Sequence, residues 1–285
     1  NQAKAYLVLS DGSVLEGRSF GAPGHTSGEV VFNTSMTGYQ EVLTDPSYGG
    51  QLVTMTYPLI GNYGINPNDF ESRQVQVRGF IVREHCTTPS HWQSTSTLGE
   101  FLHSRGIPAI EGVDTRALTR RLRSEGVMMA TLTTDETPEQ ALDRLNNTPA
   151  YGGHDYVQDV TTEGPYGWEN GRPVLRANVA PGQPHVVVVD FGVKYNILRM
   201  LAVRGCAVTV VPATAGINQV LSLKPDGVLM SPGPGDPALL DYGVELAHGL
   251  LQADTAAGKP LPVFGICLGH QVLARALGAG TFKLK

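Results

Sequence analysis

The sequence predicts two domains of different fold class: an N-terminal α+β domain rich in β-strands, and a C-terminal α/β domain with a mainly parallel sheet flanked by helices. First, 285 residues exceed the length of a typical single domain. Second, residues 5–83 are rich in short β-like runs separated by turn residues, whereas strand-like and helix-like segments alternate from residue 185 onward. Third, residues 146–184 are rich in Gly, Pro, Asn and Thr and keep no period. We therefore expect domains over 1–145 and 185–285, joined by a linker or crossing segment over 146–184.

The N-terminal domain is expected to contain mainly antiparallel strands followed by a helix. Its β-like runs cover residues 5–9, 28–35, 51–58 and 74–84. The helix is predicted within "GVDTRALTRRLRSEG" (112–126), where Leu118 and Leu122 are four residues apart. Asp114 or Thr115 is a suitable N-cap, and Gly126 is a stop signal.

The C-terminal domain begins with a strand that we expect to be buried on both faces, because "HVVVVD" (185–190) is a continuous β-branched run. Further strands are predicted at 207–213, 227–231 and 262–266, and helices at 195–205, 217–223, 238–253 and 268–278. Such alternation with short connections is typical of a parallel sheet with helices on both faces. Ligands in these sheets bind beyond the carboxyl ends of the strands, so we expect the chemistry after residues 231 and 266.

Composition excludes several classes of protein. Hydrophobic residues make up 41% of the chain, enough for a substantial core, and the net charge of −5 with no Lys/Arg-rich run argues against a nucleic-acid partner. No apolar stretch approaches the length of a membrane helix, and we find no secretory signal. Cys86, Cys206 and Cys267 offer no metal pair and no disulfide framework. We expect a cytoplasmic protein with reduced thiols.

The segment "GICLG" (265–269) has the spacing of a nucleophile elbow. Glycines on both sides allow a tight strand-to-helix turn that displays Cys267, and the helix N-terminus favours its thiolate. The backbone N–H of Leu268 can face an oxyanion. The alternative is a buried structural cysteine in a turn; the complete spacing at a strand end favours the nucleophile. We interpret Cys86 and Cys206 as structural.

A second loop, "SPGPGDP" (231–237), follows the strand 227–231. It is not a phosphate loop, because no Gly-Lys-Ser/Thr follows. Gly233 and Gly235 leave the backbone bare for a small substrate or for a second oxyanion donor. A rigid Pro/Gly turn explains the same residues equally well.

Together, "SPGPGDP" and "PVFGICLGHQVLA" (262–274) resemble the class I, triad-type glutamine amidotransferases. The N-terminal half narrows the resemblance to the small subunits of carbamoyl-phosphate synthetases, and the match covers essentially the whole chain. The segments that carry it are "GEVVFNTSMTGYQEVLTDPSYGGQLVTMTYPLIGNYG" (28–64), "GVDTRALTRRLR" (112–123) and "VDFGVKYNILRML" (189–201).

The resemblance implies a glutamine-hydrolysing subunit. Cys267 attacks the side-chain amide of L-glutamine, forms a γ-glutamyl thioester and releases ammonia. A large synthetase subunit then makes carbamoyl phosphate from bicarbonate and ATP. We expect ATP and Mg²⁺ on that partner and no cofactor in this chain. The oxyanion donors fall on the backbone of Leu268 and Gly233, and the glutamine contacts on Ser47, Gly233, Gly235, Leu268 and Gln271. Since Ser47 lies in the N-terminal domain, the resemblance places the site at a domain interface.

The general base is the missing part. In the family it is a histidine of a downstream His-Pro-Glu motif, which these 285 residues do not contain, and His270 is expected to point elsewhere. Lowering a cysteine pKa from about 8.5 to 7 takes roughly 2 kcal/mol, whereas a helix N-terminus supplies about 0.3–1 kcal/mol. We therefore expect an incomplete copy of the small subunit that forms the thioester slowly. Two alternatives are a catalytically inactive binding or regulatory module and a different elbow-cysteine hydrolase of the α/β type.

Overall fold

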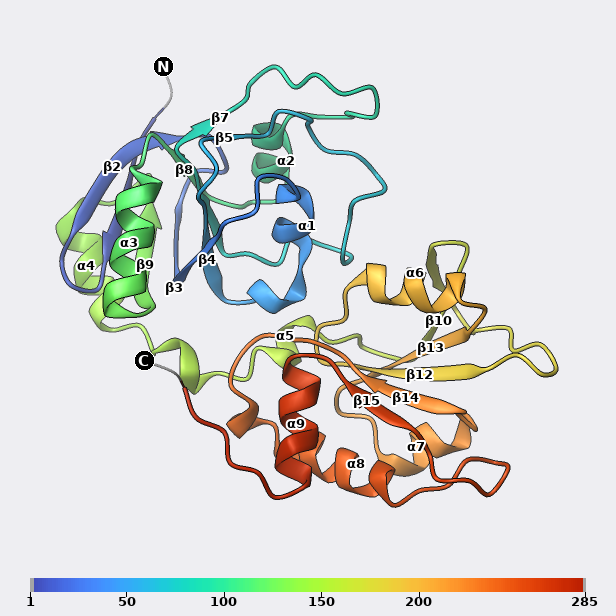
Figure 1. Cartoon of the computed structure of the whole chain (residues 1–285). Coiled ribbons are helices and arrows are strands. Elements are labelled where there is room, and N and C mark those ends of the chain that lie inside the picture. The colour runs from blue at the N-terminus through green and yellow to red at the C-terminus, as the bar shows by residue number, and fades with distance from the viewer. Residues whose placement is uncertain (1–2, 284–285) are drawn as a thin grey trace. The chain divides into compact units, whose positions relative to one another are not determined.

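The computed structural model describes residues 3–283 and divides the chain into two compact units, Asn1–Gly153 and His154–Lys285 (Figure 1). The predicted layout of two domains is confirmed. No helix within residues 3–283 has the length and apolar character needed to cross a membrane.

The first unit is built on a closed β-barrel with the strand order β1-β2-β8-β6-β4-β3-β9. Its strands are β1 (Lys4–Leu9), β2 (Val14–Ser19), β3 (His25–Asn33), β4 (Gln51–Met55), β6 (Gly79–Ile81), β8 (Ala109–Glu111) and β9 (Met128–Thr133). Four neighbouring pairs are antiparallel, but β3–β4, β4–β6 and β6–β8 are parallel. The barrel is therefore more mixed than the sequence predicted, because parallel pairing depends on crossovers that local patterns do not reveal.

Helices pack against the barrel strands. They are α1 (Tyr39–Thr44), α2 (Leu98–Ser104), α3 (Thr115–Glu125) and α4 (Pro138–Asn146). The predicted helix is confirmed as α3: Asp114 accepts a hydrogen bond from the N–H of Ala117 at 2.9 Å, and Gly126 ends the helix with φ 91°. Leu118 and Leu122 are both buried, as their spacing predicts. Two short strands, β5 (Leu59–Ile60) and β7 (Glu84–His85), pair outside the barrel.

The structure differs from the prediction for residues 146–184, which are not a linker throughout. The second unit begins at His154 and includes α5 (Val157–Val160) and an antiparallel hairpin of β10 (Tyr166–Glu169) and β11 (Arg172–Val174). The hairpin turns at Asn170 and Gly171, both with positive φ, and β10 pairs with β13. Its strands are too short to show a period, and the burial of Trp168 depends on the rest of the unit.

The second unit is a six-stranded sheet with the order β11-β10-β13-β12-β14-β15. The parallel strands are β12 (His185–Asp190), β13 (Ala207–Pro212), β14 (Gly227–Met230) and β15 (Val263–Gly265). The helices are α6 (Tyr195–Val203), α7 (Ile217–Ser222), α8 (Asp241–Leu251) and α9 (Leu268–Ala276). The predicted alternation of strands and helices after residue 185 is thereby confirmed.

Successive valines of β12 point to opposite faces of this sheet, and each face packs into a core of its own. Val187 and Val189 pack in one core with residues of α7, α8 and α9, whereas Val188 packs in the other with Leu198 of α6 (Figure 1). In the sheet, β13 is the neighbour of β12 on one side and β14 is its neighbour on the other, so the strand order reverses at β12. Sheets of this kind bind ligands beyond the carboxyl ends of the strands at such a reversal, here the ends of β12, β14 and β15.

Candidate active site

The turn between β15 and α9 holds Cys267 in a strained backbone conformation. Its φ of 51° and ψ of −110° lie in a region that residues with a Cβ rarely adopt, and it is the N-cap of α9. The Cys267 side chain is exposed. The segment therefore has the sharp strand-to-helix geometry that the spacing of its glycines predicts.

Two glycines make this turn possible because a side chain at either would strike the backbone. A Cβ added to Gly265 would lie 2.6 Å from the backbone of Gly269 and His270. A Cβ added to Gly269 would lie 2.2 Å from the carbonyl oxygen of Met230, at the end of β14. The N–H of Gly269 also donates to the carbonyl of Ser231 at 3.1 Å. The glycines thus let α9 start directly against the ends of β14 and β15.

The structure brings Gly233 and Leu268, the two predicted oxyanion donors, next to each other. A Cβ at Gly233 would lie 2.1 Å from the carbonyl oxygen of Phe191 and 2.9 Å from Leu268 Cδ2. Leu268 is the first residue of α9, so its N–H has no acceptor within the helix. The loops after β12, β14 and β15 therefore meet at this point.

Sequence reasoning missed two buried residues that shape these loops. The Asp190 carboxylate accepts from the N–H groups of Gly192 (3.0 Å) and Val193 (2.7 Å). Ser231, fully buried, accepts from the N–H of Phe191 at 2.9 Å through its hydroxyl, which donates to the carbonyl of Pro232. Both residues could have been noticed in the sequence, because each is a polar residue at the end of a buried apolar strand. A buried polar side chain must find a hydrogen-bond partner.

Gly235 and Gln271, the other predicted glutamine contacts of this unit, lie on the loop after β14 and on the first turn of α9. Gly235 has a φ of 89°, which favours glycine, in the loop after β14. Gln271 lies on α9, where its N–H donates to the carbonyl of Cys267 at 3.0 Å and its side chain is exposed. One helical turn thus separates the exposed cysteine from an exposed amide.

Comparison with known proteins assigns each unit to a described domain. Residues 7–132 match the family model "Carbamoyl-phosphate synthase small chain, CPSase domain", and residues 187–285 match "Glutamine amidotransferase class-I". A carbamoyl phosphate synthase small chain of Syntrophotalea carbinolica is 51% identical over 287 residues, covering 99% of this chain and 74% of that protein. The chain belongs to the carbamoyl-phosphate synthase small chain family. The small chain of Akkermansia muciniphila is also 51% identical, with the same coverages.

Ser47, the remaining residue assigned by resemblance to the small-chain family, belongs to the first unit. It lies in a short 3₁₀ helix (Pro46–Tyr48) that follows α1 and is half-buried. Its N–H donates to Asp45 Oδ1 at 2.9 Å. This contact fixes the turn, and the role of Ser47 toward glutamine stays a prediction.

Four histidines belong to the second unit, and they lie at different places in its fold. His185 is buried at the amino end of β12, where its Nε2 lies 2.8 Å from Thr209 Oγ1 and burial lowers its pKa. His154 lies 2.9 Å from Asp159 Oδ2, and His248 lies 3.3 Å from Gln252 Nε2. His270 is exposed in the first turn of α9. None of these histidines is followed by Pro-Glu, the sequence that the resemblance leads us to expect after the base.

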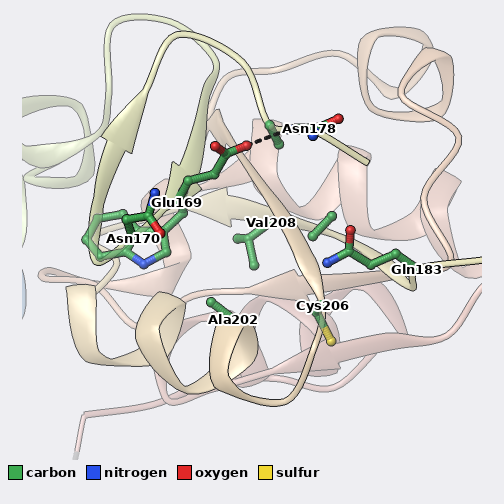
Figure 2. A pocket seen from close by; sticks show the side chains of 10 residues that line it. Glu169, Asn170, Asn178, Gln183, Ala202, Cys206 and Val208 are labelled. Atoms are coloured by element: carbon green, nitrogen blue, oxygen red, sulfur yellow. Dashed lines mark hydrogen bonds between the residues drawn. The ribbon is translucent and has the colours of Figure 1, made fainter. Parts of the chain in front are cut away.

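A cavity of about 280 Å³ occupies the opposite part of this unit and is lined by Cys206 (Figure 2). Glu169 and Asn178 also line it, and the Asn178 N–H donates to Glu169 Oε1 at 2.7 Å. Because Cys206 directly precedes β13, the cavity lies at the amino ends of the parallel strands. It is therefore separate from the loops that surround Cys267.

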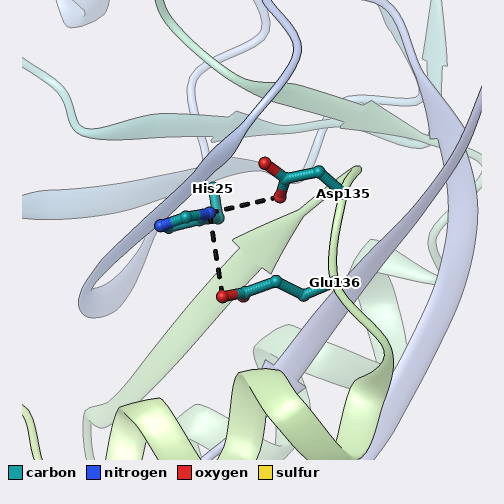
Figure 3. Close-up of side chains that lie close together, drawn as sticks. All are labelled: His25, Asp135 and Glu136. Atoms are coloured by element: carbon teal, nitrogen blue, oxygen red, sulfur yellow. Dashed lines mark hydrogen bonds and ion pairs between the residues drawn. The ribbon is translucent and has the colours of Figure 1, made fainter.

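Among the described residues of the first unit, His25, Asp135 and Glu136 form a group that could be mistaken for a metal centre (Figure 3). His25 Nδ1 lies 3.2 Å from Asp135 Oδ1 and 3.7 Å from Glu136 Oε1. Glu136, however, already accepts hydrogen bonds from the Arg144 guanidinium at 2.8–3.3 Å. The Arg144 guanidinium neutralises the charge of the Glu136 carboxylate and would repel a metal cation. We therefore interpret the group as an ion-pair cluster.

Proposed function

We propose that this chain is the glutamine-hydrolysing small chain of a carbamoyl-phosphate synthase. The observation that carries the proposal is an exposed cysteine in a strained turn at the start of a helix, within a domain that matches the class-I glutamine amidotransferases. Close identity to carbamoyl phosphate synthase small chains over 99% of the chain supports the synthase assignment.

Cys267 is the proposed nucleophile. Its sulfur attacks the side-chain amide carbon of glutamine, the C–N bond breaks, and the nitrogen leaves as ammonia after taking up a proton. Water then cleaves the γ-glutamyl thioester to give glutamate. The Leu268 and Gly233 N–H groups are the proposed donors to the oxyanion, which their neighbouring positions support. Ser47, Gly235 and Gln271 are the proposed contacts of the bound glutamine.

The proton acceptor for the thiol must also protonate the departing ammonia. The family resemblance assigns this role to the histidine of a His-Pro-Glu motif, and the 285 residues contain no such sequence. The positive end of α9 stabilises an anion by about 0.3–1 kcal/mol and cannot donate a proton to ammonia. The proposed reaction therefore requires an acid–base group in addition to Cys267 and the N-terminus of α9.

The proposed partner is the large chain of the synthase, which would bind ATP and Mg²⁺ and receive the ammonia. The net charge of −5 and the lack of a basic run agree with a protein partner rather than a nucleic acid.

Covalent labelling tests the proposed nucleophile. A glutamine-like diazoketone should label Cys267 covalently, with one group bound per chain as measured by mass spectrometry. L-glutamine should protect Cys267 against this labelling, and Cys267→Ser should abolish the labelling. Cys86 and Cys206 serve as internal controls because both are partly buried outside the elbow. Labelling that spreads equally over the three cysteines, or faster acylation by a simple ester than by the glutamine analogue, contradicts a glutaminase.

A further inference from the structure

Exposed apolar side chains gather on three segments of the first unit. Trp92 is 86% exposed and Met36 71%, and Tyr57 and Leu59 are also exposed. Elsewhere in the described part of this unit, the exposed large apolar side chains are the smaller Val14 and Val127. We call Met36, Tyr57, Leu59 and Trp92 the tryptophan surface. Apolar side chains scattered singly over a protein are ordinary, whereas a group of them that includes a tryptophan is typical of an interaction site.

Backbone hydrogen bonds place the three segments side by side. The N–H of Thr56 donates to the carbonyl of Asn33 at 3.0 Å, which joins the segment of Tyr57 to the loop of Met36. The N–H of Ser90 donates to the carbonyl of Asn62 at 3.0 Å, and β5, which contains Leu59, pairs with β7 (Figure 1). The backbone segments that carry the tryptophan surface are therefore joined to one another by hydrogen bonds.

Hydrogen bonds tie the loop that presents Trp92 to the segment of Ile65. The N–H of Thr95 and its hydroxyl both donate to the carbonyl of Ile65, at 2.8 and 3.0 Å, and the N–H of Ile65 donates to the carbonyl of Ser96 at 3.0 Å. The N–H of Ser94 donates to the carbonyl of His91 at 3.1 Å. A tryptophan presented by such a loop loses little conformational freedom when a partner covers it, which favours binding.

The neighbourhood of Trp92 also has the composition of an interface core. Residues 86–99 contain no Lys, Arg, Asp or Glu. Covering this loop therefore requires no charged side chain of the loop to leave water, and the cores of protein interfaces are depleted of charge for that reason.

The domain that carries the surface indicates the partner. The second unit matches a class-I glutamine amidotransferase domain, whereas residues 7–132 match a domain described for the carbamoyl-phosphate synthase small chain. What is specific to the synthase therefore lies in the first unit. We propose that the tryptophan surface docks on the large chain of the synthase, with Trp92 as its anchor. This inference rests on the proposed function, because that function supplies the partner.

The two tryptophans of the chain provide a direct readout. After incorporation of 5-fluorotryptophan, the ¹⁹F spectrum should contain one resonance from exposed Trp92 and one from Trp168, which is 3% exposed. Trp92→Phe identifies the first. Addition of the unlabelled large chain from the same organism should shift the Trp92 resonance, as expected for a tryptophan that leaves water. The Trp168 resonance should keep its chemical shift and serve as the reference.

Affinity should change in parallel. Trp92→Ala is expected to weaken binding of the large chain about 30-fold or more, the effect of removing an interface anchor. Val14→Ala and Leu175→Ala, which remove exposed apolar side chains elsewhere, should leave the affinity within about threefold. Since Trp92 is so exposed, Trp92→Ala should keep the melting temperature of the wild type, which separates lost docking from lost folding.

The outcomes separate this inference from the proposed function. If the wild-type chain does not bind the large chain, the proposed function fails. If the wild type binds while Trp92→Ala binds as tightly and the Trp92 resonance stays in place, the docking surface is wrong and the proposed function stands. A Trp92 resonance that moves with the concentration of this chain alone overturns the inference in favour of contact between two copies.

Discussion

At the scale of single residues, Cys267 is held in its conformation by its neighbours. A residue with a Cβ at φ 51° and ψ −110° is strained by about 1–3 kcal/mol and persists only where the surroundings leave no alternative. Gly265 and Gly269 supply that constraint, because each packs directly against backbone atoms. The glycines therefore matter here for close approach, in addition to the tightness of the turn.

Gly269→Ala tests this constraint. The added Cβ would lie 2.2 Å from the Met230 carbonyl oxygen, so α9 must move away from the end of β14. We expect a loss of about 1–3 kcal/mol in the free energy of unfolding, measured by urea denaturation, and slower labelling of Cys267. Gly164→Ala is the matched control, because nothing lies within 4 Å of its added Cβ. Equal stability of the two variants would mean that α9 tolerates the shift.

The ion-pair cluster of the first unit makes a pH-dependent contribution to stability. The Arg144 guanidinium holds the pKa of Glu136 below its usual 4.5, because its hydrogen bonds favour the charged carboxylate. A carboxyl group with a lowered pKa in the folded state stabilises the fold above its unfolded pKa. That stability is lost as the pH falls through the folded pKa.

Arg144→Gln should therefore cost about 1 kcal/mol of unfolding free energy at pH 7. The difference from the wild type should shrink once the pH falls below 4.5, since Glu136 then becomes protonated in the unfolded chain. Urea titrations at pH 7 and at lower pH measure both values, and Arg120→Gln, an exposed arginine of α3, is the control. A deficit that stays constant down to acid pH would show that Arg144 acts through packing alone.

At the scale of elements, the β10–β11 hairpin shows why a segment with the composition of a loop can still be part of a sheet. Trp168 is 3% exposed and packs against the ring of Tyr195 on α6, with ring centroids 4.8 Å apart. This single large side chain fixes a hairpin whose other residues are mostly polar or half-exposed. The hairpin thus depends on a contact with an element more than twenty residues away in sequence.

Trp168→Ala should destabilise the chain by about 3–5 kcal/mol, the effect of removing a buried aromatic side chain. Leu175→Ala, at a position 96% exposed just after the hairpin, should change stability by less than about 0.5 kcal/mol. Urea denaturation of the two variants measures the contrast. If the hairpin contributed nothing to the stability of the sheet, both variants would unfold like the wild type.

At the scale of the whole molecule, the division after Gly153 follows from how the barrel closes. β9 pairs with β1 on one side and with β3 on the other, and these two pairings close the barrel. Every barrel strand lies within the first 133 residues. The first unit therefore holds all the strands of its own barrel.

Residues 1–153 should fold alone, with cooperative thermal unfolding followed by circular dichroism. A fragment of residues 1–127 lacks β9, which leaves unpaired edges on β1 and β3, and we expect it to be unfolded or aggregated. The pair of fragments distinguishes closure of the barrel from fragment length in general. Cooperative unfolding of the shorter fragment, or none in the longer one, contradicts this account.

The sequence by itself determined those features that depend on neighbouring residues. The β-branched run of β12, the Asp114 cap and Gly126 stop of α3, and the spacing of glycines around Cys267 each act over a few residues. Burial, capping and turn geometry follow directly from such local patterns. The alternation of strands and helices in the second unit was predictable for the same reason.

Only the tertiary structure decided which distant segments meet. The parallel pairs of the barrel, the pairing of β10 with β13, and the contact of Gly233 with Phe191 join residues from about 20 to more than 40 positions apart. So does the hydrogen bond from the Phe191 N–H to Ser231. A turn or a cap is encoded by its own residues, whereas these contacts depend on the packing of the whole unit, which the period of any one segment does not specify.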